Sequence, residues 1–176
     1  SGNHRVPSDP IMSVERERPL PIYIYRDGQA AITSLWKSKP FLNPDIRKLE
    51  LSDFLHTKLD WIYSPGVRCS SAANQHTAVW QWYTHVSEWF AIAERLGFYT
   101  LSYEALLSNP ERELQKIAKH YSLNWSSDGF VNVKELVGPS PNKGTIDSWL
   151  DSFSVQDIEH FLSMKPKDFP LVYTTN

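Results

Sequence analysis

The stretch "PIYIYRDGQAAITSLWKS", residues 21–38, decides the fold. Its first part, Pro21–Tyr25, is short, β-branched and aromatic, which is typical of a buried strand. Asp27 and Gly28 then interrupt the strand pattern, and residues 29–38 are rich in good helix formers. The stretch therefore predicts a strand that leads directly into a helix.

The rest of the chain predicts a second strand with helices around it. A long helix is expected over residues 76–96, because apolar residues recur there every three or four positions, and Gly97 should end it. The segment "FYTLSY", residues 98–103, predicts the second strand. Further helices are expected around Ser52 as a possible N-cap, from Pro110 onward, and over residues 155–164.

Two strands, each followed by a helix, indicate an α/β fold with a mostly parallel sheet flanked by helices. The chain shows no internal repeat and no clear linker, so we expect residues 1–176 to form a single domain. Two strands are few for a complete sheet of this kind. The remaining strands are either weakly marked or lie outside this chain.

The bulk composition narrows the class of protein. Hydrophobic residues make up 41% and the formal net charge is −2, which describes a globular protein and makes no general case for nucleic-acid binding. We find no membrane-spanning run, signal peptide or lipidation motif. The single cysteine, Cys69, excludes an internal disulfide and suits a reducing compartment. We expect a cytoplasmic location, with the Golgi lumen as the alternative.

Arg26 stands at the end of the first strand, and ligands bind at the carboxyl ends of strands in open α/β sheets. Its forked guanidinium suits a phosphate or sulfate, and Ser34, two turns into the helix, can add a hydroxyl donor. In the alternative interpretation, Arg26 pairs with a carboxylate such as Asp27 and Ser34 only packs. These residues alone leave both interpretations open.

Four segments, in order, resemble the sulfotransferases that use 3′-phosphoadenosine 5′-phosphosulfate (PAPS). They are the opening stretch with Ser eight residues after Arg, "WYTHVSEW" at 82–89, "FYTLSYEALLSNPERELQKIAKHYSL" at 98–123 and "NKGTIDSWLDSFS" at 142–154. The resemblance covers about Pro21 to Phe161. It implies a P-loop-like sheet of the sulfotransferase type, incomplete at its N-terminus. It also implies an enzyme that moves a sulfuryl group from PAPS to a hydroxyl or amine acceptor.

The resemblance also implies a set of nucleotide contacts. Arg26 and Ser34 would hold the 3′-phosphate, and Tyr103 would lie against the adenine. Lys143 and Gly144 would close over the 3′-phosphate with an ammonium and a backbone N–H. In the alternative interpretations, Tyr103 is a core tyrosine at the strand end, and Lys143 and Gly144 belong to a plain polar turn, "PNKG".

The chain departs from the family pattern in three places. Asn142 stands where an arginine is usual, and Asp147-Ser148 replaces the usual Gly-Asp before tryptophan. The family's phosphate loop, which cradles the 5′-phosphosulfate, is not in this sequence. We therefore expect this chain to be the C-terminal part of the fold and to be unable, by itself, to transfer sulfate.

In the helix motif at residues 82–89, we assign Trp82, His85 and Trp89 to packing.

The catalytic base is expected before the first strand. His4 precedes Arg26 by 22 residues, a spacing similar to that of the family's catalytic histidine, and it is our candidate base. The alternative is a terminal histidine without a role, with Glu15 and Glu17 as weaker candidates for the base. No metal-ligand spacing emerges among the histidines, so we expect no metal.

The acceptor cannot be derived from the residues, and we expect a small molecule, glycan or lipid. The loop Ser64–Gln75 is expected to border the acceptor site. Two other functions stay open: a non-catalytic nucleotide-binding or interaction module, and another phosphoryl-transfer enzyme such as a kinase.

Overall fold

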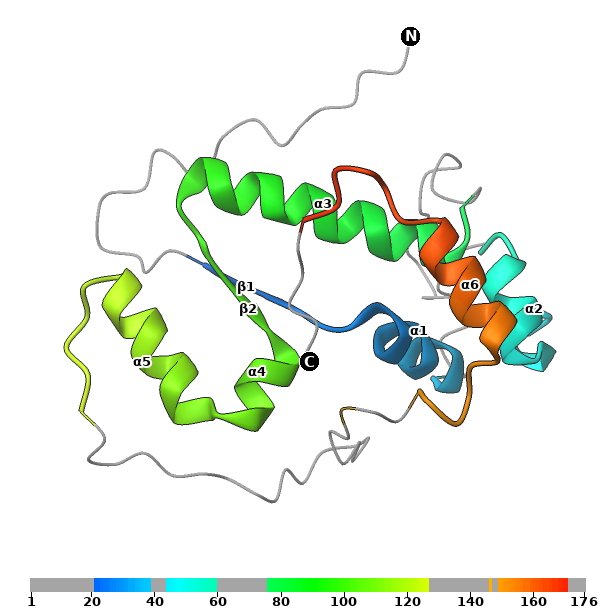
Figure 1. Ribbon diagram of the computed structural model, residues 1–176, viewed down its shortest axis with the longest axis horizontal. Coiled ribbons are helices and arrows are strands. Elements are labelled where there is room, and N and C mark those ends of the chain that lie inside the picture. The colour runs from blue at the N-terminus through cyan, green and yellow to red at the C-terminus, as the bar shows by residue number, and fades with distance from the viewer. Residues whose placement is uncertain (1–20, 39–43, 60–75, 127–145, 147–148, 171–176) are drawn as a thin grey trace, which may run out of the picture.

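The computed structural model describes residues 21–38, 44–59, 76–126, 146 and 149–170 (Figure 1). Several residues singled out above lie outside these ranges: His4, Glu15, Glu17, Cys69, the loop Ser64–Gln75, Asn142, Lys143, Gly144 and Asp147-Ser148. Every structural statement below concerns the described residues.

The described elements include both predicted strands, each followed directly by a helix. In chain order they are β1 (Ile22–Tyr25), α1 (Gly28–Lys37), the 3₁₀ helix η2 (Ile46–Lys48), α2 (Leu51–His56), α3 (Ala78–Leu96), β2 (Tyr99–Ser102), α4 (Tyr103–Ser108), α5 (Pro110–His120) and α6 (Val155–Ser163). The predicted strand–helix unit at residues 21–38 is confirmed. The helices expected at residues 76–96, from Pro110 and at residues 155–164 are confirmed to within two residues at each end.

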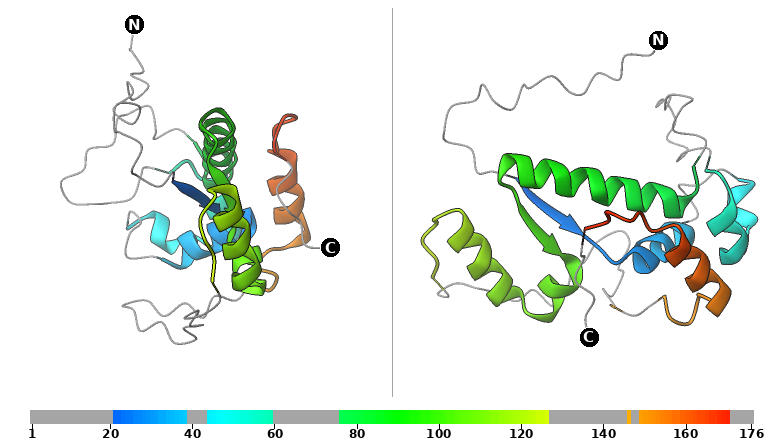
Figure 2. Two further views of the ribbon diagram at one scale, coloured as in Figure 1. Left: turned by 90° about the vertical axis from the view of Figure 1, so that its left-hand side faces the viewer. Right: turned by 45° about the horizontal axis from the view of Figure 1, so that its top comes forward.

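The two strands pair in parallel, in a register that sets Ile22 opposite Tyr99 and Tyr25 opposite Ser102. This pairing confirms the α/β class. Helix α3 contacts both strands, while α4 and α5 contact β2 (Figures 1 and 2). Because the strands are parallel and in register, their carboxyl ends lie side by side.

The core lies where α1, α2, α3 and α6 meet (Figure 2). Its fully buried side chains include Phe54 and Leu55 from α2 and Val79 and Val86 from α3. These α3 positions belong to the predicted apolar stripe, so that helix packs as its periodicity indicates. None of the helices in the described ranges is both long and apolar enough to cross a membrane.

The prediction that β1 is a buried strand is only partly correct. Tyr25 is buried, but Ile22 and Ile24 are 39% and 50% exposed. Alternate residues of a strand point to opposite faces, and Tyr23 packs against α3 on the covered face. The two isoleucines point to the other face, where they stay partly exposed.

Two local predictions are corrected by capping interactions. Helix α2 begins after Glu50, and Ser52 is not its N-cap, because the Ser52 hydroxyl donates to Asp157 instead. Strand β2 ends at Ser102 rather than at Tyr103, because the Ser102 hydroxyl accepts the Ala105 N–H at 3.0 Å and starts α4.

Candidate functional site

Arg26 and Tyr103 lie together at the carboxyl edge of the sheet. Each follows directly on the last paired residues of its strand, Tyr25 and Ser102. The guanidinium carbon of Arg26 lies 5.2 Å from the centre of the Tyr103 ring, within the range of a cation–π contact. The parallel register therefore brings together two residues that are 77 positions apart, both expected to contact the nucleotide.

Within the described residues, one donor of the Arg26 guanidinium is left without a partner. Its Nε is buried and has no hydrogen-bond partner among the described residues. A buried donor left in this way costs about 1–3 kcal/mol, which an acceptor on a ligand would recover. A guanidinium carries several N–H donors, which suit an anion with several oxygens, such as a phosphate.

Asp27 does not neutralise Arg26 by an ion pair in the described part of the chain. The Asp27 carboxylate instead accepts the Ala30 N–H at 2.9 Å and caps α1. Burial raises the pKa of Asp27 above its usual value and the nearby Glu104 carboxylate adds to the rise, while the charge of Arg26 opposes it. The alternative in which Arg26 and Asp27 form a structural pair is therefore not the arrangement found.

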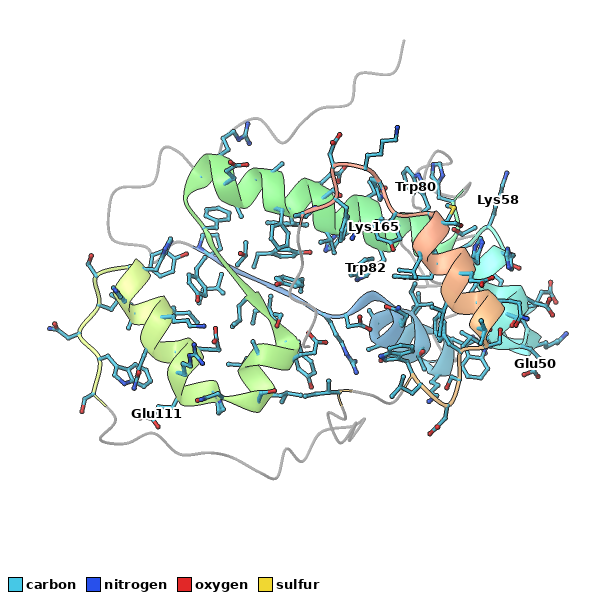
Figure 3. The ribbon with its side chains drawn as sticks, viewed as in Figure 1. Glu50, Lys58, Trp80, Trp82, Glu111 and Lys165 are labelled. Carbon is cyan, nitrogen blue, oxygen red and sulfur yellow. The ribbon has the colours of Figure 1, made fainter. Side chains whose placement is uncertain are left out.

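The main chain beside Arg26 is anchored by two side chains. The Trp82 indole N–H donates to the Arg26 carbonyl at 3.2 Å, and the Asp27 N–H donates to Glu104 Oε1 at 2.9 Å. Trp82 extends from α3 toward the start of α1 (Figure 3). From the sequence, Trp82 was assigned to packing and Glu104 was not singled out. The sequence carries one signal for Glu104, an acidic residue in the first turn of a helix that directly follows a strand.

Gly28, the first residue of α1, lies where a side chain would not fit. A Cβ on Gly28 would collide with Cζ of Phe161 and would lie 2.9 Å from ring carbons of Trp82. The rings of Trp82 and Phe161 are 5.6 Å apart, and Phe161 belongs to α6. The last described helix therefore packs directly over the start of the helix that follows Arg26.

Ser34 lies half-buried in α1, eight residues after Arg26. Its carbonyl accepts the N–H of Ser38 at 3.0 Å and the hydroxyl of Ser38 at 2.7 Å. The structure thus places Ser34 on the helix that begins beside Arg26. The predicted partners Lys143, Gly144 and His4 lie outside the described residues.

The aromatic residues of α3 beyond Trp82 pack against the sheet. Tyr23 of β1 stacks on Trp89 with ring centres 5.4 Å apart, and its ring edge meets His85 at 6.0 Å. Burial, with a contribution from Tyr25, raises the pKa of Tyr23 to about 12. The assignment of His85 and Trp89 to packing agrees with these contacts.

In the described part of the chain, a strand-end arginine without an ion-pair partner faces an aromatic ring at the carboxyl edge of a parallel sheet, which is the edge where open α/β sheets bind ligands. Comparison with known families gives the class of protein. The profile of the sulfotransferase domain matches residues 12–137 of this chain. The match covers more than half of the chain, which therefore belongs to the sulfotransferase family, and the resemblance noted in the sequence is confirmed.

Two curated relatives support this assignment. Sulfotransferase 1A1 of Mus musculus is 28% identical over 167 residues, covering 80% of this chain and 52% of the relative. Sulfotransferase 1C2 of Rattus norvegicus is 25% identical over 105 residues, covering 46% of this chain and 36% of the relative. The chain thus spans about half, or less, of the length of the curated relatives it matches.

Proposed function

We propose that this protein transfers a sulfuryl group from PAPS to a hydroxyl or amine acceptor. Membership of the sulfotransferase family supports the transfer of sulfuryl groups in general. The observation that carries PAPS as the donor is Arg26, whose buried Nε is without a partner among the described residues and whose guanidinium lies over Tyr103. A nucleotide with both a phosphate and an aromatic base matches that pair of groups.

In this proposal Arg26 binds the 3′-phosphate of the donor through charged hydrogen bonds, and Ser34 adds a hydroxyl. Tyr103 lies against the adenine. Lys143 and Gly144 remain proposed contacts to the 3′-phosphate from a second segment. We propose that residues 1–176 belong to one P-loop-like sulfotransferase domain.

The reaction would replace the bond between sulfur and the donor's bridging oxygen by a bond between sulfur and the acceptor atom. The proton of the acceptor must pass to a base, for which we propose His4, with Glu15 or Glu17 as substitutes. We propose a small molecule, glycan or lipid as acceptor and the cytoplasm as the location. The lone cysteine, Cys69, suits that compartment.

Calorimetry on the full-length protein tests the nucleotide site. Adenosine 3′,5′-bisphosphate should bind more tightly than adenosine 5′-monophosphate, which lacks the 3′-phosphate. Arg26→Ala should weaken bisphosphate binding by about 1.5–3 kcal/mol, the worth of hydrogen bonds to a charged group. Arg112→Ala, on the exposed surface of α5, is the matched control and should change neither affinity.

Transfer from labelled PAPS to a panel of phenols, alcohols, amines and sugars then tests the reaction. Incorporation of label into an acceptor supports the proposed enzyme. Tight bisphosphate binding with no transfer to any acceptor would favour the non-catalytic nucleotide-binding module. Equal affinity for the two nucleotides, unchanged by Arg26→Ala, would refute the nucleotide site itself.

A further inference from the structure

The peptide bond between Arg26 and Asp27 is held at both of its polar ends. Its carbonyl accepts the Trp82 indole N–H at 3.2 Å, and its N–H donates to Glu104 Oε1 at 2.9 Å. A peptide unit is planar, so hydrogen bonds at both ends define its orientation. Together with the strand pairing that ends at Tyr25, that orientation limits the directions in which the Arg26 side chain leaves the main chain.

The two anchors come from elements far from Arg26 in sequence. Trp82 belongs to α3 and lies 56 positions away, while Glu104 belongs to α4 and lies 77 positions from Asp27. Tyr25 and Ser102 are the last strand pair. Beyond them, the Asp27 N–H donates to the Glu104 carboxylate and not to a main-chain carbonyl of the neighbouring strand. The anchored peptide therefore joins β1 to both helices.

Glu104 is well suited to hold this bond. The residue is only 9% exposed, so its hydrogen bond has little competition from water. It is the second residue of α4, where the helix dipole favours a negative charge. Shortening its side chain would leave the partly buried Asp27 N–H without its acceptor and would free one end of the peptide.

We propose that Glu104 is a positioning residue for nucleotide binding, which together with Trp82 holds the Arg26–Asp27 peptide so that the Arg26 guanidinium stays over Tyr103 and meets the 3′-phosphate. This inference rests on the proposed function. Glu104 acts through the main chain of Arg26 and Asp27 and does not touch the nucleotide. Its loss should therefore weaken recognition of the 3′-phosphate more than recognition of the rest of the nucleotide.

The test is the ratio of affinities for adenosine 3′,5′-bisphosphate and adenosine 5′-monophosphate, measured by calorimetry on the full-length protein. Glu104→Ala should reduce this ratio by about 10-fold or more, a usual effect for a residue that orients a binding group. Glu104→Gln keeps an acceptor oxygen and should retain most of the ratio. Trp82→Phe keeps an aromatic ring without the N–H donor and should reduce the ratio as Glu104→Ala does.

Two comparisons separate positioning from general stability. In an Arg26→Ala background, Glu104→Ala should lower the ratio no further, because both changes remove the same contact. Glu113→Ala, which changes another buried glutamate, on α5, should leave the ratio unchanged. If Glu104→Ala does not fold, the ratio of affinities measured for Trp82→Phe tests the positioning role instead.

Several outcomes would overturn the inference. An equal loss of affinity for both nucleotides in Glu104→Ala would show a structural role only, and an equal loss in Glu104→Gln would point to the charge instead of the hydrogen bond. If Arg26→Ala abolishes the preference for the bisphosphate while Glu104→Ala and Trp82→Phe keep it, only the positioning role is wrong. If the unmodified protein shows no such preference, the proposed function fails and this inference fails with it.

Discussion

The hydroxyl of Ser52 donates to both carboxylate oxygens of Asp157, at 2.8 and 2.9 Å, and so joins α2 to α6 across 105 positions of sequence. The same carboxylate accepts the N–H and the hydroxyl of Ser154 in a capping box that begins α6. Asp157 is only 4% exposed, whereas Ser52 and Ser154 are exposed, so these bonds lie at the border between the core and the solvent. One carboxylate thus both starts the last helix and attaches it to the core.

We expect Asp157→Ala to destabilise the protein by about 2–3 kcal/mol and Ser52→Ala by about 1 kcal/mol. The larger loss arises because the aspartate change removes the capping box and leaves two serine hydroxyls without their acceptor. Urea unfolding of the full-length protein measures both values. Asp151→Ala, an exposed aspartate before α6, is the control. Equal losses for Asp151→Ala and Asp157→Ala would contradict the role given to the capping box.

A histidine pair beside this junction predicts a dependence of stability on pH. The rings of His56 and His160 are 3.8 Å apart, and Nε2 of His160 is buried without a hydrogen-bond partner in the described structure. Burial, together with His56, lowers the pKa of His160 below its usual 6.5, and Asp157 opposes the shift. The unfolded chain therefore binds the proton more readily than the folded protein.

The free energy of unfolding should consequently fall as the pH is lowered through 6.5. His56→Asn removes the neighbouring imidazole, so the pKa of His160 should rise toward 6.5 and the pH dependence should become smaller. Urea unfolding between about pH 7.5 and 5.5, with ring resonances followed by NMR, measures both effects. His85→Asn on α3 serves as the control. A slope that His56→Asn leaves unchanged would count against coupling between the two rings.

Gly28→Ala should destabilise the protein, because the added Cβ would collide with Phe161 and press on Trp82. We expect a loss of about 1–3 kcal/mol, the usual range for overpacking. Phe161→Leu is destabilising on its own, but in the double variant part of the Gly28→Ala loss should be recovered. Gln29→Ala, one residue later in α1, is the control. Additive losses in the double variant would show that Phe161 does not cause the conflict.

Gly97→Ala tests the end of α3 by a different mechanism. Gly97 has φ = +71°, in the left-handed region, and an added Cβ would meet no atom within 4 Å. The cost is therefore one of backbone conformation alone, about 1 kcal/mol. Gly97→Asn should cost less than Gly97→Ala, because asparagine tolerates this conformation better. Thermal or urea unfolding distinguishes the two, and the reverse order would reject the explanation.

Features set by near neighbours in the sequence could be predicted with good accuracy. The strand and helix of residues 21–38, the end of α3 at Gly97 and the start of α5 at Pro110 depend on local periodicity, on turn conformation and on the missing N–H of proline. Arg26 could be singled out because a charged residue at a strand end is itself a local pattern. The error at Ser52 has the opposite origin, because its hydroxyl finds its partner, Asp157, 105 positions away. The error at Tyr103 is a local one: the Ser102 hydroxyl accepts the N–H of Ala105, three positions on, and starts α4.

By itself, the sequence determined the class of fold, the order of its elements and the identity of the candidate phosphate-binding arginine, because these follow from contacts within a few residues and from the family's motifs. Only the tertiary structure decided that Arg26 faces Tyr103, that Asp27 caps α1 instead of pairing with Arg26, and that Trp82 and Glu104 hold the intervening peptide. The parallel register of two short strands brings these groups together, and a hydrogen bond between residues 77 positions apart leaves no periodic trace in the chain.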